Sequence, residues 1–351
     1  MSSRHCFNYF FLGQHCRLEI NSEHVEATTR FERYAELFPA FVDRSGTPAQ
    51  LTVVIHDLAD HAGREVEPAV VAQLRQYLQH SYATIAPEVL DAVCTARYLA
   101  APRARELLEA TLDNPNERGI SVQKDFLVFS RRNAGQLEAF ADVTASVQEA
   151  WAYHAMNFFK VFFFAQDTVR LHGSGATHGD AALLLLANTG GGKSTMKNLF
   201  LNAVPEPAPF TDDSIMARAT TQGFELYQDP VEFLRWCYLP EAQRAEQVIP
   251  GVRPPLAAQP SLYYLIKADT TATRPASAAE ILTLIKEEAF YQHGYLTQRF
   301  ITEPQAEALL QRYFDNTLRF LTHARCHVAE VRHNDDYAEL FAEFRRQLEV
   351  G

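Results

Sequence analysis

The chain has 351 residues, 47% hydrophobic and 21% charged, a composition typical of globular domains and not of a disordered chain. Its length predicts one large domain or two ordinary ones, each with its own core. A formal net charge of −11 argues against broad binding of nucleic acid or of anionic membranes, because both need clustered Lys and Arg.

The expected compartment follows from the cysteines and from the absence of targeting patterns. Five cysteines are scattered without the close pairs of a zinc site or a disulfide framework. The opening "MSSRHCFNYFFLG" lacks the charged-then-apolar layout of a secretory signal. The apolar stretch Phe158–Ala165 is too short to span a bilayer. We therefore expect a cytoplasmic protein that does not contact membranes.

The first 146 residues mix strand and helix patterns and predict an N-terminal α/β domain. Its two candidate roles are docking of a peptide and oligomerisation. Alternating or β-branched runs predict strands, whereas apolar residues at helical spacing predict helices, two of which have a proline near their start. The expected strands are 7–13, 15–20, 51–58 and 120–132, and the expected helices are 24–38, 68–82 and 86–112.

A second domain is expected over residues 147–351. It opens with a helix over 147–165 that is apolar nearly all round, so Trp151 and the phenylalanines near it are interpreted as core. The runs "TVRLHGSGAT" and "AALLLLAN" then predict two strands, joined by a hairpin turn at His178-Gly179-Asp180. The domain is expected to close with helical segments on either side of a short strand, "HVAEVR".

The second of these strands leads directly into a glycine-rich loop and the start of a helix, "LLLLANTGGGKSTMKNLF". Strand, glycine loop and helix N-terminus together form an anion site, because backbone N–H groups and the helix dipole converge on a phosphate. The pattern G-x-x-x-x-G-K-[ST] is matched except at its first position, where Ala187 replaces glycine. The predicted nucleotide-binding residues are Asn188, Thr189, Gly190, Gly191, Gly192, Lys193, Ser194 and Thr195.

Candidate catalytic side chains lie on both sides of this loop. His172 stands on the strand before it, and "FTDDSIM" places Asp212 and Asp213 together near the end of a later predicted strand. A carboxylate pair behind a phosphate loop suits Mg²⁺ binding and deprotonation of an attacking hydroxyl. Neighbouring residues on an extended strand point to opposite sides, so the two carboxylates can do different jobs.

The block from Leu171 to Asp213 resembles the core of the HPr kinase/phosphorylase superfamily. It is most similar to the stand-alone HPr-kinase-like serine kinases, such as those encoded beside lasso-type ribosomal peptides. That family carries a histidine on the strand before its phosphate loop and an aspartate pair after it. His172, the loop from Gly190 to Thr195, and the pair Asp212 and Asp213 match those positions.

The resemblance implies a P-loop-containing α/β kinase domain that uses ATP and Mg²⁺. Lys193 would stabilise charge on the moving phosphoryl group, and Ser194 and Asp213 would bind the metal. Asp212 would accept the proton of the acceptor hydroxyl, and His172 would position the γ-phosphate or the catalytic carboxylate. The family's phosphorylase signature, E-I-R-G-x-G, is not visible, which favours a kinase alone. Because HPr kinases form oligomers, a homo-oligomer is also implied.

Three functions stay open at this point. The leading one is transfer of the γ-phosphoryl group to a serine or similar hydroxyl of a protein or peptide. The others are a small-molecule kinase and a regulatory module that binds nucleotide without transfer. Arg253, Lys267 and Arg274 are further candidates for phosphate contacts, although each is more often a surface charge. The proline-rich stretch 252–261 is expected to be a loop, and His178 is expected to be exposed.

Overall fold

The computed structural model describes residues 3–23, 26–61, 63–81, 87–123, 126–131, 135–142, 167–237, 251–257, 259–286, 303–333 and 335–350. The chain divides into two compact units, one formed by residues 1–162 with 295–308 and the other by 163–294 with 309–351. The predicted boundary at 146/147 and the predicted helix over 147–165 lie outside the described residues.

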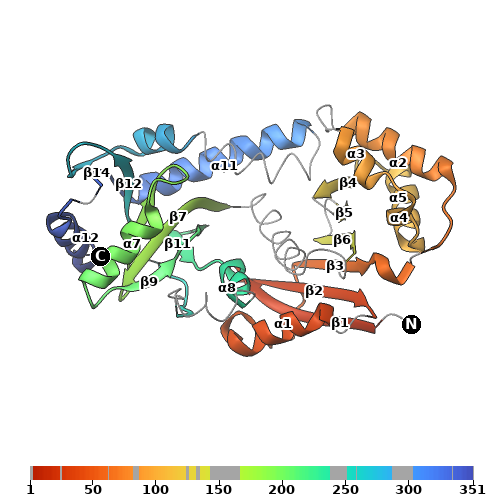
Figure 1. The fold of residues 1–351 in the computed structure, drawn as a ribbon, viewed down its shortest axis with the longest axis horizontal. Coiled ribbons are helices and arrows are strands. Elements are labelled where there is room, and N and C mark those ends of the chain that lie inside the picture. Colours follow the sequence, from red (N-terminus) through yellow and green to blue (C-terminus); the bar gives the residue numbers. More distant parts are fainter. Residues whose placement is uncertain are drawn as a thin grey trace. The chain divides into compact units, whose positions relative to one another are not determined.

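In the described part of unit 1, six strands form one mixed sheet in the order β1-β2-β3-β6-β5-β4 (Figure 1). β2, β3 and β6 run parallel as neighbours, whereas the other pairs are antiparallel. The strands are β1 (Ser3–Phe11), β2 (Gln14–Ser22), β3 (Leu51–Asp57), β4 (Arg118–Gln123), β5 (Phe126–Arg131) and β6 (Gln136–Ala141).

Two of the sequence predictions for unit 1, one helix and one strand, were wrong. The helix expected over 86–112 is three helices, because Thr95 and Ala101 are extended, the latter as the residue before Pro102. The strand expected over 120–132 is two strands, β4 and β5, and β6 was not predicted. The helices are α1 (Glu26–Leu37), α2 (Pro68–Ser81), α3 (Pro87–Val93), α4 (Ala96–Leu99) and α5 (Pro102–Asp113), with short 3₁₀ turns at Pro39–Phe41 and Leu58–His61.

The described residues of unit 2 contain an eight-stranded mixed sheet in the order β11-β10-β7-β8-β12-β14-β13, with β9 also paired to β7. β8, β12 and β14 run parallel and form its centre. The strands are β7 (Thr168–His178), β8 (Ala181–Leu186), β9 (Ala208–Thr211), β10 (Ser214–Thr220), β11 (Gly223–Tyr227), β12 (Ser261–Lys267), β13 (Ala272–Pro275) and β14 (Arg325–Val331).

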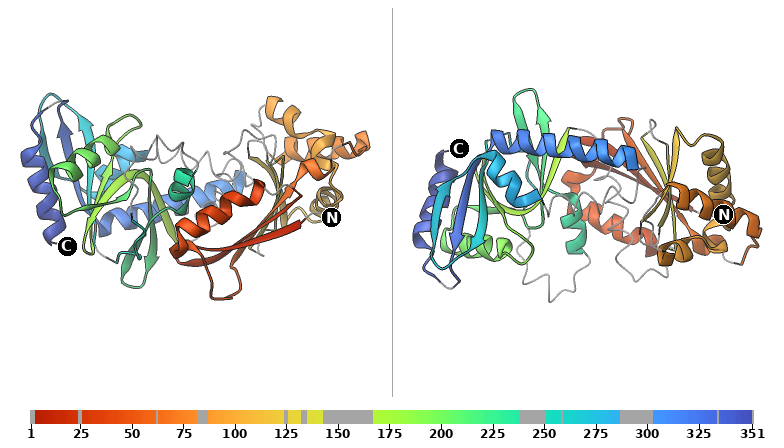
Figure 2. Two further views of the ribbon diagram at one scale, coloured as in Figure 1. Left: turned by 60° about the horizontal axis from the view of Figure 1, so that its bottom comes forward. Right: turned by 90° about the horizontal axis from the view of Figure 1, so that it is seen from above.

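Helices cover both faces of this central sheet (Figure 2). The side chains of β8 alternate between the two faces, so Leu183 and Leu185 join one core cluster and Leu184 and Leu186 the other. The first cluster contains α7 (Lys193–Ala203) and α12 (Ala338–Val350), and the second contains α11 (Glu303–His323). A further helix, α8 (Pro230–Cys237), follows β11 in the chain.

The mixed α/β class is therefore confirmed, as are several local predictions. The hairpin of β7 and β8 turns at Gly179, whose φ of 57° lies in the left-handed region. Residues 252–257, 259 and 260 form no helix; Leu256 makes a bridge with Leu226, and the Pro260 carbonyl accepts the N–H of Arg325. None of the described helices is both long enough and apolar enough to cross a bilayer.

The packing of α7 against α12 gives a first prediction. Phe200 of α7 is fully buried and makes edge or tilted ring contacts with Phe344 and Phe341. Phe200→Ala should lower the free energy of unfolding by about 3–5 kcal/mol, because it leaves a cavity in the core. The neighbouring Leu199 is 42% exposed, so Leu199→Ala is the matched control and should cost less than about 1 kcal/mol. If urea unfolding showed the same loss of unfolding free energy for both variants, it would contradict this packing.

Candidate functional site

The loop between β8 and α7 is shaped by left-handed glycines. Gly190 has a φ of 75° and Gly192 a φ of 85°, a region that costs other residues about 1–2 kcal/mol each. Gly192 caps the N-terminus of α7, and its carbonyl accepts the N–H of Met196. The loop therefore presents backbone rather than side chains at the positive end of a helix.

Gly191 is required for a different reason, which also explains Ala187. A Cβ on Gly191 would lie 2.5 Å from the Ala187 Cβ and 2.7 Å from the Asn188 carbonyl oxygen. The N–H of Gly191 donates to that same oxygen, closing a tight turn. Ala187 is buried in the core cluster beneath α7. The departure from the usual glycine thus puts a methyl group in the core, against Gly191, which has no side chain to meet it.

Lys193 and Ser194, the two candidate site residues at the start of α7, are buried to different extents. Lys193 is buried, and its Nζ donates to the Ala187 carbonyl at the beginning of the loop, 2.9 Å away. The buried ammonium therefore lies against the loop itself. Ser194 is half-buried, and its hydroxyl donates to the Asp212 carbonyl at 3.5 Å. This contact links the first turn of α7 to the acidic pair.

Asp212 and Asp213 lie between β9 and β10, two strands that both run antiparallel to β7. β9 pairs with residues 175–177 of β7, and β10 pairs with residues 168–172. The register shift of this pairing lies before the acidic pair, between Gly175 and Ala176 opposite β9, and the Asp213 carbonyl accepts the N–H of Gly173. The two carboxylates bond to different partners.

The two aspartates pair with different side chains, Asp212 with a lysine and Asp213 with a histidine. Asp212 Oδ1 lies 2.8 Å from the Nζ of Lys197, one helical turn beyond Lys193 on α7. Asp213 Oδ1 lies 3.5 Å from the Nε2 of His172 on β7. His172, Asp212 and Asp213, predicted as a set, are therefore brought together with the start of α7. Lys197 was not predicted, although its spacing of four residues from Lys193 on one helix was the available signal.

A carboxylate from α8 holds the backbone of this acidic turn. Glu232 Oε1 accepts hydrogen bonds from the N–H groups of Asp213 (2.9 Å) and Ser214 (2.6 Å) and from the Thr211 hydroxyl (2.6 Å). Its Oε2 accepts the N–H of Asp212 at 3.0 Å. Four hydrogen bonds converge on this one carboxyl group, so Glu232 fixes the backbone from which both aspartates project.

Sequence reasoning also missed Glu232, which occupies the helix position typical of a capping glutamate. Asp229 precedes α8 and caps it, because its carboxylate accepts the N–H of Val231, and Pro230 is the first helical residue. Glu232 is then the third helical residue, the position typical of a capping box. Here its side chain binds the 212–214 backbone instead. Burial, and next the charge of Asp229, raise the pKa of Glu232 to about 7.

Two more side chains support the edges of the site. The Tyr264 hydroxyl on β12 donates to Asn188 Oδ1 at 2.8 Å and so orients the first side chain of the loop. Gln228 donates to the carbonyl oxygens of Phe210 and Gly251 and accepts the N–H of Arg253. The 251–253 segment is thereby tied to the strand that leads into Asp212.

The remaining predicted side chains are more dispersed. Within the loop and the first turn of α7, Asn188, Thr189, Gly190, Gly192 and Thr195 are exposed and Gly191 is half-buried. Arg274 pairs with Glu280 at 2.5 Å, and Lys267 is exposed at the end of β12. His178 is exposed in the β7–β8 turn, as predicted.

The arrangement fits a phosphate group. The loop offers backbone in the conformation that only glycines adopt freely, a buried ammonium and a helix N-terminus, and a serine hydroxyl lies beside them. Among the described residues, no three His, Cys, Asp or Glu side chains gather around one point that could hold a metal. A Mg²⁺ bound with a nucleotide takes most of its ligands from phosphate and water, so Ser194 and one carboxylate would suffice.

Neither the models of known protein families nor the curated proteins contain a match to this chain.

The raised pKa of Glu232 predicts a pH-dependent stability. An acid whose pKa is higher in the folded chain contributes stability that is complete below its ordinary pKa of 4.5 and is lost as the pH rises to about 7. The urea midpoint of the wild type should therefore fall between pH 5 and 8 more steeply than that of Glu232→Gln, which cannot ionise.

Asp229→Asn is the matched variant for this comparison. It keeps a side chain able to cap α8 but removes the second cause of the raised pKa, so its slope should be intermediate. Parallel slopes for the wild type and Glu232→Gln would show that the Glu232 carboxyl does not titrate in this range.

Proposed function

We propose that the chain is an ATP- and Mg²⁺-dependent kinase that transfers the γ-phosphoryl group to a serine or similar hydroxyl of a protein or peptide. One observation carries the proposal: the acidic turn is bonded to the first turns of the glycine-loop helix, through Ser194 and Lys197. A phosphate-binding loop alone suits many functions. A loop joined to a carboxylate pair suits proton removal beside a bound phosphate.

The roles of the residues follow from their places. The loop from Asn188 to Gly192 and the Lys193 ammonium would hold the phosphates, with Lys193 moving from the Ala187 carbonyl to them. Ser194 and an aspartate would hold the metal, which when bound neutralises phosphate charge. The second carboxylate would take up the proton of the acceptor hydroxyl. Because Glu232 fixes the backbone of both aspartates, their positions need little reorganisation.

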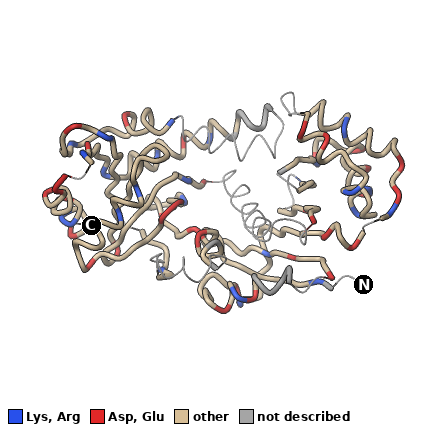
Figure 3. The backbone as a smooth tube through the Cα atoms, viewed as in Figure 1, with Lys and Arg blue, Asp and Glu red and all other residues tan. Residues whose placement is uncertain are grey.

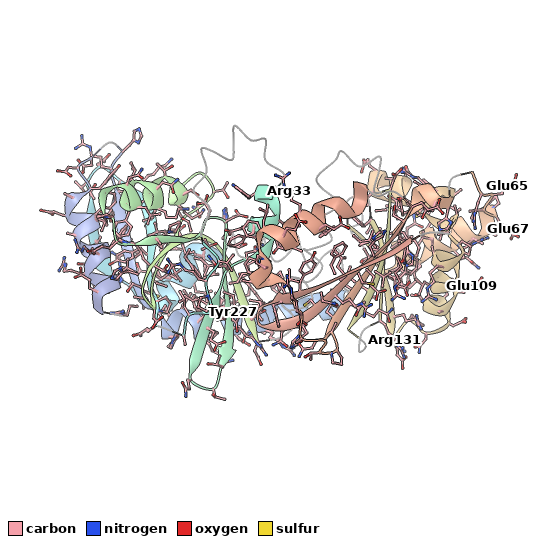
Figure 4. All side chains as sticks on the ribbon, turned by 90° about the horizontal axis from the view of Figure 1, so that it is seen from below. Arg33, Glu65, Glu67, Glu109, Arg131 and Tyr227 are labelled. Atoms are coloured by element: carbon pink, nitrogen blue, oxygen red, sulfur yellow. The ribbon has the colours of Figure 1, made fainter. Side chains whose placement is uncertain are left out.

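A protein or peptide acceptor is favoured over nucleic acid by the distribution of charge. Acidic and basic residues are interspersed along the described chain of each unit (Figure 3). Glu65, Glu67 and Glu109 are exposed in unit 1, and their side chains project from it (Figure 4). An acidic protein of net charge −11 repels polyanions and attracts basic segments over long range.

The test is transfer of label from γ-labelled ATP with Mg²⁺, in the presence of a cell lysate. Wild-type protein should label a polypeptide, and Lys193→Met should reduce the rate on the order of 100-fold or more, because the buried cation beside the loop is lost. Arg346→Met is the matched control, since it removes a cation that is 68% exposed on α12. Its rate should stay close to that of the wild type.

The two alternative functions are outcomes of the same experiment. Label that moves only to a small molecule would replace the proposal with a metabolite kinase. ATP binding without transfer to any acceptor would replace it with a regulatory nucleotide-binding module.

A further inference from the structure

Lys197 is the more deeply buried of the two lysines of α7, and its placement separates the two aspartates. The side chain is 2% exposed, whereas that of Asp212 is 52% exposed. Among the described residues, the Asp212 carboxylate is the partner that the Lys197 ammonium bonds. A charge removed from water needs such a partner, so the pair is fixed more firmly than a surface ion pair.

Asp212 is attached to the glycine-loop helix at two points. Its carboxylate binds Lys197, and its carbonyl accepts the Ser194 hydroxyl. Both contacts come from α7, the helix that starts with Lys193. Asp212 therefore belongs to the side of the site where phosphate and metal would lie. Lys197 also neutralises its charge, which limits repulsion between Asp212 and a triphosphate.

Asp213 lies on the other side. Its carboxylate reaches His172 on β7, and its backbone is held by Gly173 of the same strand and by Glu232 of α8. Among the described residues, no hydrogen bond or ion pair joins the Asp213 side chain to α7. A carboxylate beside an imidazole, without a buried ammonium bonded to it, is suited to receive a proton and share it with that imidazole.

We propose that Lys197 is a positioning residue that holds Asp212 on the nucleotide side, and that Asp213, next to His172, is the base for the acceptor hydroxyl. This inference rests on the proposed kinase function and reverses the roles expected from the family resemblance. The acceptor O–H bond breaks and its proton binds Asp213 Oδ, while the acceptor oxygen forms a bond to phosphorus. The electron pair of the broken P–O bond stays on the nucleoside diphosphate.

The experiment compares Asp213→Asn with a paired change at Lys197 and Asp212. Asp212→Asn alone is a poor test, because it leaves a buried ammonium without its partner and should lower the thermal midpoint. The double variant Lys197→Met/Asp212→Asn removes both charges and should regain much of that midpoint. Each variant is measured for its thermal midpoint, its affinity for Mg-ATP, and its kcat and KM for transfer of γ-label to lysate polypeptides.

Asp213→Asn should bind Mg-ATP like the wild type but lose kcat on the order of 100-fold, the effect of removing a general base. The double variant should affect KM more than kcat, with a raised KM for Mg-ATP and a kcat within about tenfold of wild type. A double variant that binds Mg-ATP normally and loses kcat as severely as expected for Asp213→Asn would overturn the assignment. So would full kcat in Asp213→Asn.

Failure of the kinase function itself has a different signature. Wild-type protein would then transfer no label to any acceptor, and the assignment of the base would fall with it. The thermal midpoints still judge the positioning role of Lys197, since they need no activity. A double variant no more stable than Asp212→Asn would contradict the pairing.

Discussion

The ion pair between Lys197 and Asp212 is the contact on which the geometry of the site depends. It connects α7, whose start is set by the glycine loop, to the turn between β9 and β10. The second link between them, from the Ser194 hydroxyl to the Asp212 carbonyl, is longer, at 3.5 Å. Glu232 secures the same turn by accepting hydrogen bonds from the backbone N–H groups of Asp213 and Ser214. The acidic turn is thus held by the Lys197 ammonium at the Asp212 side chain and by the Glu232 carboxyl group at its backbone.

The glycine loop shows how a local pattern can tolerate a departure from its usual sequence. Ala187 occupies a position where most such loops have glycine, yet its methyl group lies in the core and not in the phosphate cradle. The close approach is taken over by Gly191, where any side chain would meet Ala187 and Asn188. Three successive glycines therefore serve two purposes: left-handed backbone at Gly190 and Gly192, and space at Gly191.

What the sequence could predict depended on whether the determining contacts were local. The hairpin of β7 and β8, the loop and α7 follow one another in the chain, so periodicity and turn chemistry were enough. The two interruptions of the predicted 86–112 helix were harder to predict, although Pro102 marked the second of them. Lys197 and Glu232 were missed because their partners lie 15 to 20 residues away, and only the fold brings them together. The pairing of Asp213 with His172 likewise depends on the register of β10 against β7.

The proposed function depends on binding of a nucleotide through its phosphates, which titration calorimetry with Mg-ATP and with AMP measures. We predict saturable binding of Mg-ATP by the wild type, with AMP at least on the order of 100-fold weaker, because the loop and Lys193 would contact phosphates that AMP lacks. Gly191→Ala should lose this binding. Gly179→Ala is the control at the other end of β8: its φ of 57° makes alanine costly to stability, but it lies outside the loop, so binding should be kept. Equal affinity for AMP and Mg-ATP, or unchanged binding by Gly191→Ala, would show that the loop does not bind the phosphates.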